Sequence, residues 1–296
     1  MVAGDYRWKK IFRDVPNWLY LIPVFAFVGF FIYYGIGYTV YISLFEWNGI
    51  SPDKTFIGIQ HYLQLFRDSI FYLSVGHTFI FMVITIFTQM ILGLLIALML
   101  KSQVRLKAVY KVIFFLPTVM SQAVIAALFR QIFNAHDGEL NRFLEAVGFD
   151  FLALSWLADP DIALYSIAVI NIWEFTGFSF IMYFAALSVL DREVYEAAYI
   201  EGAGFFKTFI KITFPMLKST HYSLIMLGVI GSLKTFDLVF LTTGGGPGRA
   251  SELLSTYIYK KMIVEYNAGY ASALCVIFLL LTLILTAIQL RAYKER

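Results

Sequence analysis

Charge is scarce in this sequence. Lys, Arg, Asp and Glu make up only 15% of its 296 residues, whereas hydrophobic residues make up 60%. An ordinary soluble domain contains about 25% charged and about 45–50% apolar residues, and a disordered chain needs low hydrophobicity together with high net charge. The composition therefore excludes both of these classes and predicts an integral membrane protein.

Cysteine and histidine are also rare. The chain has one cysteine, Cys275, and four scattered histidines, which excludes an internal disulfide and leaves no cluster with the spacing of metal ligands. No nucleophile and base stand in a catalytic arrangement, so we expect no catalytic or metal-binding residues and no enzyme. The net charge of +3 is too small to predict a nucleic acid partner.

The uncharged residues are gathered into long runs. Four runs contain 31, 32, 18 and 25 residues, close to or above the roughly 20 apolar residues that cross a bilayer as a helix. Two more runs are interrupted, one by Glu174 and the other by Lys234 and Asp237. The sequence thus predicts an all-α integral membrane protein with six transmembrane helices rather than a barrel of alternating strands. The expected spans are residues 18–45, 71–100, 108–133, 162–190, 219–243 and 267–291.

The basic residues predict the orientation of these spans. With six spans, 15 of the 23 Lys and Arg fall on the side of both termini, seven fall on the other side, and Lys234 lies within a span. The positive-inside rule therefore places both termini in the cytoplasm. The first apolar run is longer than the core of a signal peptide, so we expect it to remain as an anchor.

Prolines mark where helices are expected to bend or begin. Pro23 in the first span and Pro117 in the third each lack a backbone donor, so each should kink or start a helix. Asp159, Pro160 and Asp161 have the pattern of an N-cap followed by proline at the first helical position, which predicts that the fourth span begins there.

The loop between the fourth and fifth spans carries signals for two short helices. Asp191 is a good N-cap, and Glu193 places an acid where the helix dipole favours one. Gly202 suits a helix end that needs a positive φ. Residues 191–215 are therefore expected to form a helix, a turn and a second helix at the cytoplasmic surface. The second helix has an apolar face of Phe205, Phe209 and Ile212 and a basic face of Lys207 and Lys211.

From the residues alone, two interpretations of this segment stay open. Lys207 and Lys211 fit an interfacial helix that rests on the headgroups of membrane lipid. A short acidic helix that is closed by the run Gly202–Gly204 fits an anionic leaflet poorly and favours another role.

The same loop contains a pattern with a specific spacing. It consists of Glu196, Ala197 and Ala198, then Gly202 after three residues, and Ile212, Thr213, Phe214 and Pro215 after nine more. This pattern resembles the EAA loop of the permease subunits of binding-protein-dependent ABC importers, which reads E-A-A, three residues, G, nine residues, I-x-L-P. Further segments resemble the sugar-transporting, maltose-type branch of that family: Phe56–Tyr62, Phe115–Pro117, Phe236–Asp237, Thr243–Pro247 and Gly269–Ala273.

The resemblance implies a type I ABC importer permease fold in a bacterial or archaeal plasma (inner) membrane. It also implies partners: a second homologous permease subunit, two ATPase subunits and an external solute-binding protein. Glu196, Ala197, Ala198, Gly202, Ile212 and Pro215 are then the residues that dock on an ATPase subunit and couple it to transport. The chain has no G-x-x-x-x-G-K-[ST] motif, so ATP and Mg²⁺ are expected on the ATPase subunits and no cofactor in this chain.

Three charged residues interrupt the fourth and fifth expected spans: Glu174, Lys234 and Asp237. A charge at the centre of a spanning helix costs about 2.5–3.5 kcal/mol on the insertion scale. Lys234 and Asp237 are three positions apart and can pair on one helix face. Two interpretations remain: a neutral pair that stabilises helix packing, or a pair that lines a wet cavity and contacts a solute.

The fourth span brings polar and aromatic residues together. Asn171, Trp173 and Glu174 combine an aromatic face, an amide and a carboxylate, which suits the C–H face and the hydroxyls of a sugar. Gln89 and Gln122 on the second and third spans complete the candidate substrate site. An alternative role for each of these polar residues is a structural hydrogen bond between helices rather than a substrate contact.

Together with this resemblance, the sequence predicts a permease subunit of an ATP-driven importer for an oligosaccharide or glycoside. The alternatives are a permease for a glycerol phosphate ester or an acidic sugar, and an ion-coupled secondary transporter. We divide the chain into residues 1–70, with the first span and an external segment, and residues 71–292, a five-helix core that contains the coupling loop 191–215. The run Gly244–Gly248 on the outer side is expected to form a tight turn. The resemblance implies that this loop lies near the solute-binding protein.

Overall fold

The computed structural model describes residues 20–101 and 106–294. In this part of the chain nearly all regular structure is helical, because the strands β1 (Phe45–Glu46) and β2 (Thr55–Phe56) have two residues each and pair only with one another. The contacts divide the chain into two compact units. The first contains the segment that ends at Arg67 together with Lys260–Leu279, and the second contains Asp68–Tyr259 and the segment from Leu280 onward.

The first unit begins with a helix whose side chains are mostly exposed. Ile22–Ile42 is apolar and continuous over 21 residues, and Pro23 lies in its first turn, so this proline starts the helix as expected. The elements of this unit are α2 (Ile22–Val28), the π-helix η1 (Gly29–Tyr33), α3 (Tyr34–Ile42), β1, β2, α4 (Gln60–Leu65), η5 (Lys260–Val264) and the first part of α16 (Ala268–Lys294).

The start of α16 packs closely on the segment after α3. The amide of Gly269 donates to the carbonyl oxygen of Trp47 at 3.0 Å. A Cβ at residue 269 would overlap the carbonyl oxygen of Phe45 and lie 2.6 Å from Nε2 of His61. Only glycine allows this approach of two backbones.

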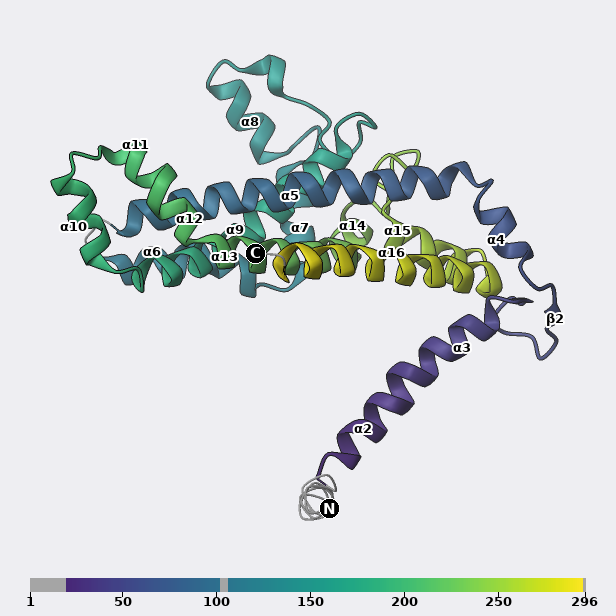
Figure 1. Ribbon diagram of the computed structural model, residues 1–296. Coiled ribbons are helices and arrows are strands. Elements are labelled where there is room, and N and C mark those ends of the chain that lie inside the picture. The colour runs from purple at the N-terminus through teal and green to yellow at the C-terminus, as the bar shows by residue number, and fades with distance from the viewer. Residues whose placement is uncertain (1–19, 102–105, 295–296) are drawn as a thin grey trace, which may run out of the picture. The chain divides into compact units, whose positions relative to one another are not determined.

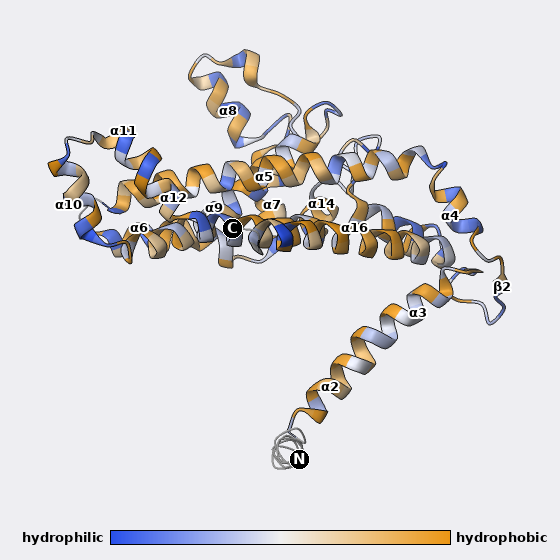
Figure 2. Cartoon of the chain, viewed as in Figure 1, coloured by the Kyte–Doolittle hydropathy of each residue, from blue (hydrophilic) through white to orange (hydrophobic). Residues whose placement is uncertain are grey.

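The second unit is built on two long helices, α5 (Ser69–Lys101) and α9 (Ala163–Ser188), which pack along one another (Figure 1). Gly93 of α5 lies against Ser179 and Phe180 of α9, so the two backbones come close, as is common where small residues form helix interfaces in membranes. Buried apolar residues fill the space around this pair in two clusters. Orange, hydrophobic residues dominate α5 in Figure 2.

Shorter helices surround this pair. They are α6 (Lys107–Phe115), the 3-10 helix η2 (Leu116–Val119), α7 (Gln122–Ile132), α8 (Glu139–Ala146), η3 (Asp150–Leu152), α10 (Arg192–Ile200), α11 (Phe205–Thr208), the π-helix η4 (Phe209–Thr213), α12 (Phe214–Met216), α13 (Lys218–Lys234), α14 (Asp237–Thr242) and α15 (Leu254–Tyr259).

The expected spans correspond to single long helices, to one bent pair of helices and to one interrupted helix. Among the described residues, four helices are long and apolar enough to cross a membrane: Ile22–Ile42, α5, α9 and Ala268–Tyr293. The third expected span is a pair of helices, Lys107–Val119 and Gln122–Ile132, bent by 96°. Pro117 precedes this bend, which confirms the expected kink. The fifth expected span is α13, which has 17 residues, followed by α14 after a break.

The predicted N-cap of the fourth span at Asp159 is wrong, although the expected start of the span at residue 162 agrees with the helix within one residue. The helix α9 begins at Ala163, its N-cap residue is Ile162, and no side chain caps it. Asp159 Oδ1 instead accepts from the amide of Asp161 at 2.9 Å. The residues before α9 therefore form a local turn in which the aspartate bonds its own backbone two positions on, and the helix starts only after that turn.

Candidate functional site

The segment that carries the EAA pattern begins with a capped helix. Asp191 is the N-cap of α10, with extended backbone angles, and its Oδ1 accepts from the amide of Glu193 at 3.0 Å. One of the unpaired amides of the first turn is thereby satisfied. The predicted N-cap is confirmed.

A glycine turn ends the helix. Gly202 has φ +73°, and its amide donates to the carbonyl oxygen of Tyr199 at 3.0 Å. The amide of Ala203 donates to the carbonyl oxygen of Ala198 at 2.9 Å. These two bonds form a Schellman motif, in which a residue with positive φ stops the helix and satisfies its last carbonyls. The predicted helix end at Gly202 is thus confirmed.

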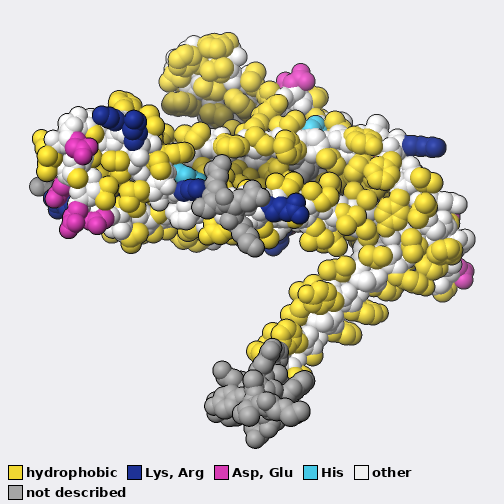
Figure 3. Space-filling model, viewed as in Figure 1, with side chains coloured by type: hydrophobic (Ala, Val, Ile, Leu, Met, Phe, Trp, Pro, Cys, Tyr) yellow, Lys and Arg dark blue, Asp and Glu magenta, His cyan; other side chains and the backbone are white. Residues whose placement is uncertain are grey.

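The chain then returns through α11, η4 and α12 to the start of α13. A hydrogen bond of 3.2 Å between the hydroxyl groups of Tyr195 and Thr213 links the outgoing helix to the returning arm. Figure 3 shows charged side chains gathered around α10 and α11. Residues 191–215, which we call the coupling segment, are therefore a helix, a turn and a second helical arm, as expected from the sequence.

The residues of the EAA pattern differ in their exposure. Within the coupling segment, Ala198 is buried, whereas Ala197 is exposed. The carboxylate of Glu196 is also exposed and lies 2.9 Å from Nε of Arg192. Ile212 is half-buried and Pro215 is exposed. Glu196 is therefore available on the surface of α10 to a partner.

Sequence reasoning missed the exposed apolar residues of this segment. Tyr199, Ile200, Phe205 and Phe206 have 83%, 85%, 70% and 77% of their surfaces exposed. The signal was present in the sequence, because these four apolar residues flank Gly202 on both sides of the turn. Exposed aromatic and aliphatic side chains around a charged anchor are typical of a protein docking surface.

A second candidate site is a cavity of about 330 Å³ inside the second unit. Residues of α5, α9 and α13 form its walls, together with η2, α7 and α14. It brings together five of the seven residues predicted to contact a substrate, which are Gln89, Gln122, Asn171, Lys234 and Asp237.

Amide groups tie the helices together at this cavity. Gln89 Nε2 donates to Oδ1 of Asn171 at 3.0 Å and to its carbonyl oxygen at 3.1 Å. Gln122 Nε2 donates to Oε1 of Glu174 at 2.5 Å, and Thr118 Oγ1 donates to the carbonyl oxygen of Glu174 at 2.7 Å. The carboxylate of Glu174 is buried behind the lining, where its Oε2 has no hydrogen-bond partner among the described residues.

The expected pairing of Lys234 with Asp237 on one helix face is wrong. The helix α13 ends at Lys234, Thr235 has an extended ψ of 113°, and α14 starts at Asp237. The carbonyl oxygen of Thr235 accepts a bond from Ser255 Oγ at 2.5 Å. Because the helix is interrupted, the two charges line the cavity separately, and no ion pair joins them in the described chain.

Trp173 does not join the other predicted substrate residues. Its side chain is 40% exposed and its ring centroid lies 5.2 Å from that of Phe129, and it is not among the described residues that line the cavity. Helical geometry explains this, because each residue of an α-helix turns by about 100° and Trp173 is two positions from Asn171.

Aromatic residues other than Trp173 line the cavity. Phe175 and Phe178 of α9 and Phe236 in the break line it. The two α9 residues stand four and seven positions after Asn171 and hence share its helix face. That spacing was the signal that could have found them.

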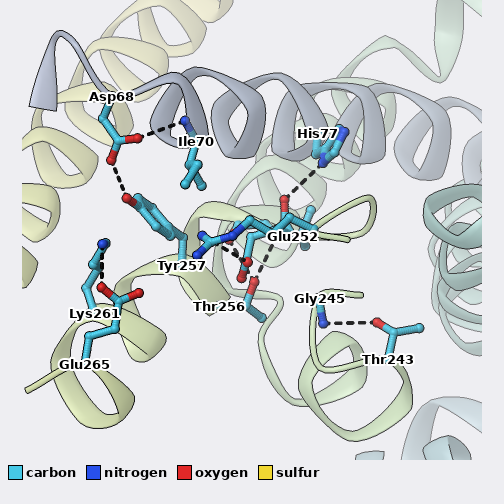
Figure 4. A network of polar contacts seen from close by, with 12 residues as sticks. Asp68, Ile70, His77, Thr243, Gly245, Glu252, Thr256, Tyr257, Lys261 and Glu265 are labelled. Carbon is cyan, nitrogen blue, oxygen red and sulfur yellow. Dashed lines mark hydrogen bonds and ion pairs between the residues drawn. The ribbon is translucent and has the colours of Figure 1, made fainter. Parts of the chain in front are cut away.

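At the N-terminal end of α5, a polar network holds the segment that follows the glycine-rich run Gly244–Gly248 (Figure 4). Asp68 accepts bonds from the amide of Ile70 and from the hydroxyl of Tyr257. His77 Nδ1 lies 3.2 Å from the carbonyl oxygen of Glu252. Within the glycine-rich run, Gly244, Gly245 and Gly248 have positive φ. The predicted tight turn is confirmed, and its connection to α5 is fixed by side chains.

Comparisons with known proteins agree with these features. A family model described as "Binding-protein-dependent transport system inner membrane component" matches residues 89–294. The chain is 37% identical to the probable ABC transporter permease protein YurN of Bacillus subtilis, over 95% of this chain and 97% of the relative. It is 32% identical to the lactose transport system permease protein LacF of Rhizobium radiobacter, over 97% of each chain.

A solved structure gives the same fold. In the bacterial alginate ABC transporter in complex with alginate pentasaccharide-bound periplasmic protein, one chain superposes on 95% of this one with a TM-score of 0.82, at 22% identity and 95% coverage of its own length. The fold is therefore the predicted type I ABC importer permease fold. The chain belongs to the family of inner membrane components of binding-protein-dependent transport systems.

Proposed function

We propose that this chain is one of two homologous permease subunits of an ATP-driven importer in the plasma (inner) membrane. The importer passes an oligosaccharide or glycoside, delivered by an external solute-binding protein, through a path that includes the cavity. Two separate ATPase subunits bind ATP and Mg²⁺ and hydrolyse the ATP. This chain binds no cofactor and takes no catalytic part.

The lining of the cavity carries this proposal. The amides of Gln89 and Asn171 stand beside the rings of Phe175, Phe178 and Phe236. A few placed polar groups among aromatic side chains are typical of small-molecule sites, and amides can both donate to and accept from sugar hydroxyls. LacF, a full-length relative, is a lactose transport permease by name, which supports a carbohydrate.

The coupling segment supports the ATP-driven class. Glu196 stands exposed on a short, well-capped helix, and Ala197 beside it allows close approach of a partner. Tyr195 and Thr213 join this helix to the arm that leads into α13, and α13 lines the cavity. A movement imposed on α10 by an ATPase subunit therefore has a direct mechanical route to the cavity.

Lys234 favours a second candidate substrate class. Its side chain lines the cavity, is exposed there, and has no ion-pair partner among the described residues. A lysine in this setting suits an anionic solute such as an acidic sugar or a glycerol phosphate ester. Asp237 lines the same cavity and opposes an anion, which is why we place the neutral carbohydrate first.

The test is uptake by the assembled transporter in liposomes, with its binding protein outside. Thermal-shift measurements on the binding protein select the solute. We expect uptake of a neutral oligosaccharide or glycoside only when ATP is supplied on the ATPase side. A binding protein stabilised by acidic sugars or phosphate esters alone would favour the second candidate. Uptake by this chain without ATP, driven by an ion gradient, would overturn the proposal.

A further inference from the structure

A second, larger cavity lies beneath the coupling segment. Its volume is about 1140 Å³, and its walls come from the last turns of α5 and α9, the start of α6, and α10, α11 and η4. It shares no lining residue with the candidate substrate cavity.

Every charged side chain that lines this cavity in the described chain is basic: Lys101, Lys107 and Arg192. Arg192 is already paired with Glu196. Lys101 Nζ lies 4.1 Å from the ring centroid of Tyr195. Among the described residues, Lys101 makes no ion pair with an acidic side chain. Lys107 likewise makes no ion pair within the described part of the chain. The rim therefore carries positive charge that an anion would neutralise.

The charge and the apolar surface lie at different depths. Lys101 ends α5, whereas Leu95 and Leu98 line the same cavity from the preceding turns. Leu95 is six residues before Lys101, hence about 9 Å farther along the helix axis. Phe205 and Phe206 of α11 add aromatic surface to the lining. Along α5 the cavity is thus basic at the level where the span ends and apolar toward the membrane interior, and aromatic side chains of the coupling segment also line it.

We propose that this cavity binds an anionic phospholipid of the cytoplasmic leaflet. The phosphate lies at Lys101 and Lys107, and an acyl chain lies along Leu95 and Leu98. The match of charge and depth favours a lipid, because anionic headgroups attract basic residues at the membrane surface while long side chains place their charge at that level. The N-terminal residues 1–19 are a poorer occupant, because they contain four basic and two acidic residues. Their net charge is therefore positive, like that of the rim.

A lipid in this position would contact the coupling segment. Tyr195 of α10 and Thr213 of the returning arm line the cavity, so an occupant lies against the hydrogen bond that joins α10 to that arm. Tyr199 also lines the cavity and belongs to the exposed apolar surface of the segment. We infer that the bound lipid stiffens the segment and raises the efficiency of ATP-driven transport. This consequence rests on the proposed function, whereas lipid binding itself does not.

Lipid retention by the purified transporter tests the binding. The complex is extracted in mild detergent, titrated with phosphatidylglycerol or phosphatidylcholine, and examined by native mass spectrometry. We expect phosphatidylglycerol to be retained in preference to phosphatidylcholine. Each lysine near the surface contributes about fivefold to anionic lipid binding, so the double variant Lys101→Gln, Lys107→Gln should retain phosphatidylglycerol about 25-fold less well.

Two further variants keep the test decisive. Lys218→Gln removes an exposed basic residue that does not line the cavity and should retain the lipid like the wild type. Leu95→Trp keeps all charges and narrows the apolar end, so it should reduce retention of both lipid classes. Equal retention of phosphatidylglycerol by the wild type and the double lysine variant would overturn the lipid site, as would an ATPase subunit or another protein segment filling the cavity.

The effect on transport is measured separately, in vesicles of phosphatidylcholine with or without phosphatidylglycerol. We expect phosphatidylglycerol to increase uptake per ATP hydrolysed in the wild type and not in the double lysine variant. If the lipid binds but the ratio stays the same, the inferred effect on coupling is wrong and the binding site stands. If no ATP-driven uptake occurs at all, the proposed function fails instead.

Discussion

Replacing Gly177 with alanine should disrupt the contact between α9 and α6. The new Cβ would overlap the carbonyl oxygen of Phe114, and it would lie 2.7 Å from the carbonyl carbon of Phe114 and 3.0 Å from Cα of Phe115. Non-bonded carbons pack at about 3.5–4.0 Å, so the helices must separate by about 1 Å. Overpacking costs about 1–3 kcal/mol, and we expect about 2–3 kcal/mol because the obstacle is backbone, which cannot rotate away.

Thermal unfolding of the purified transporter measures this cost. A loss of about 2–3 kcal/mol lowers Tm by about 4–12 °C in a domain of this size. Gly76→Ala is the matched control, because Gly76 lies in α5 with no atom within 4 Å of the added Cβ, and alanine favours a helix by about 1 kcal/mol over glycine. Its Tm should equal or exceed that of the wild type. A Tm for Gly177→Ala as high as that of Gly76→Ala would refute the close packing of α9 on α6.

Two other predictions concern the coupling segment and the substrate cavity. Asp191→Ala removes the N-cap of α10 and should destabilise that helix by about 1 kcal/mol, seen as faster hydrogen exchange in α10 with unchanged exchange in α5; equal exchange in α10 would contradict the cap. Asn171→Leu removes the side-chain acceptor of Gln89 Nε2, which keeps only the carbonyl oxygen of residue 171. The change also removes an amide from the cavity, so ATP-driven uptake should fall while assembly, measured by co-purification, is retained. Normal uptake by this variant would exclude Asn171 from the substrate path.

The sequence predicted those parts of the fold that depend on local chemistry. Asp191 and Gly202 act through bonds to backbone groups within a few residues, so their roles follow from residue type and position alone. The bend after Pro117 follows from a missing amide donor in the same way. The long spans were equally clear, because the bilayer requires continuous apolar runs.

Features that depend on distant segments were not predictable. The break after Lys234 has no glycine or proline to announce it, and the free carbonyl oxygen of Thr235 is satisfied by Ser255, 20 residues later. Sequence spacing therefore paired Lys234 with Asp237, although the structure separates them. The wrong prediction for Trp173, in contrast, was avoidable from the sequence. Two positions along a helix correspond to a rotation of about 200°, which excludes Trp173 from the helix face of Asn171.

The proposed function depends on the binding of an ATPase subunit to the coupling segment through Glu196. This side chain is 61% exposed and makes its ion pair with Arg192. Glu196→Lys therefore places a like charge beside that arginine and changes the surface without disturbing the core. Glu139→Lys is the control, since Glu139 is also exposed but lies in α8.

The decisive measurement is the amount of ATPase subunit that co-purifies with each variant from the membrane. We predict that Glu196→Lys reaches the membrane at the level of the wild type but loses the ATPase subunits, whereas Glu139→Lys retains them. Co-purification of the ATPase subunits with Glu196→Lys at the ratio found for the wild type would contradict the account.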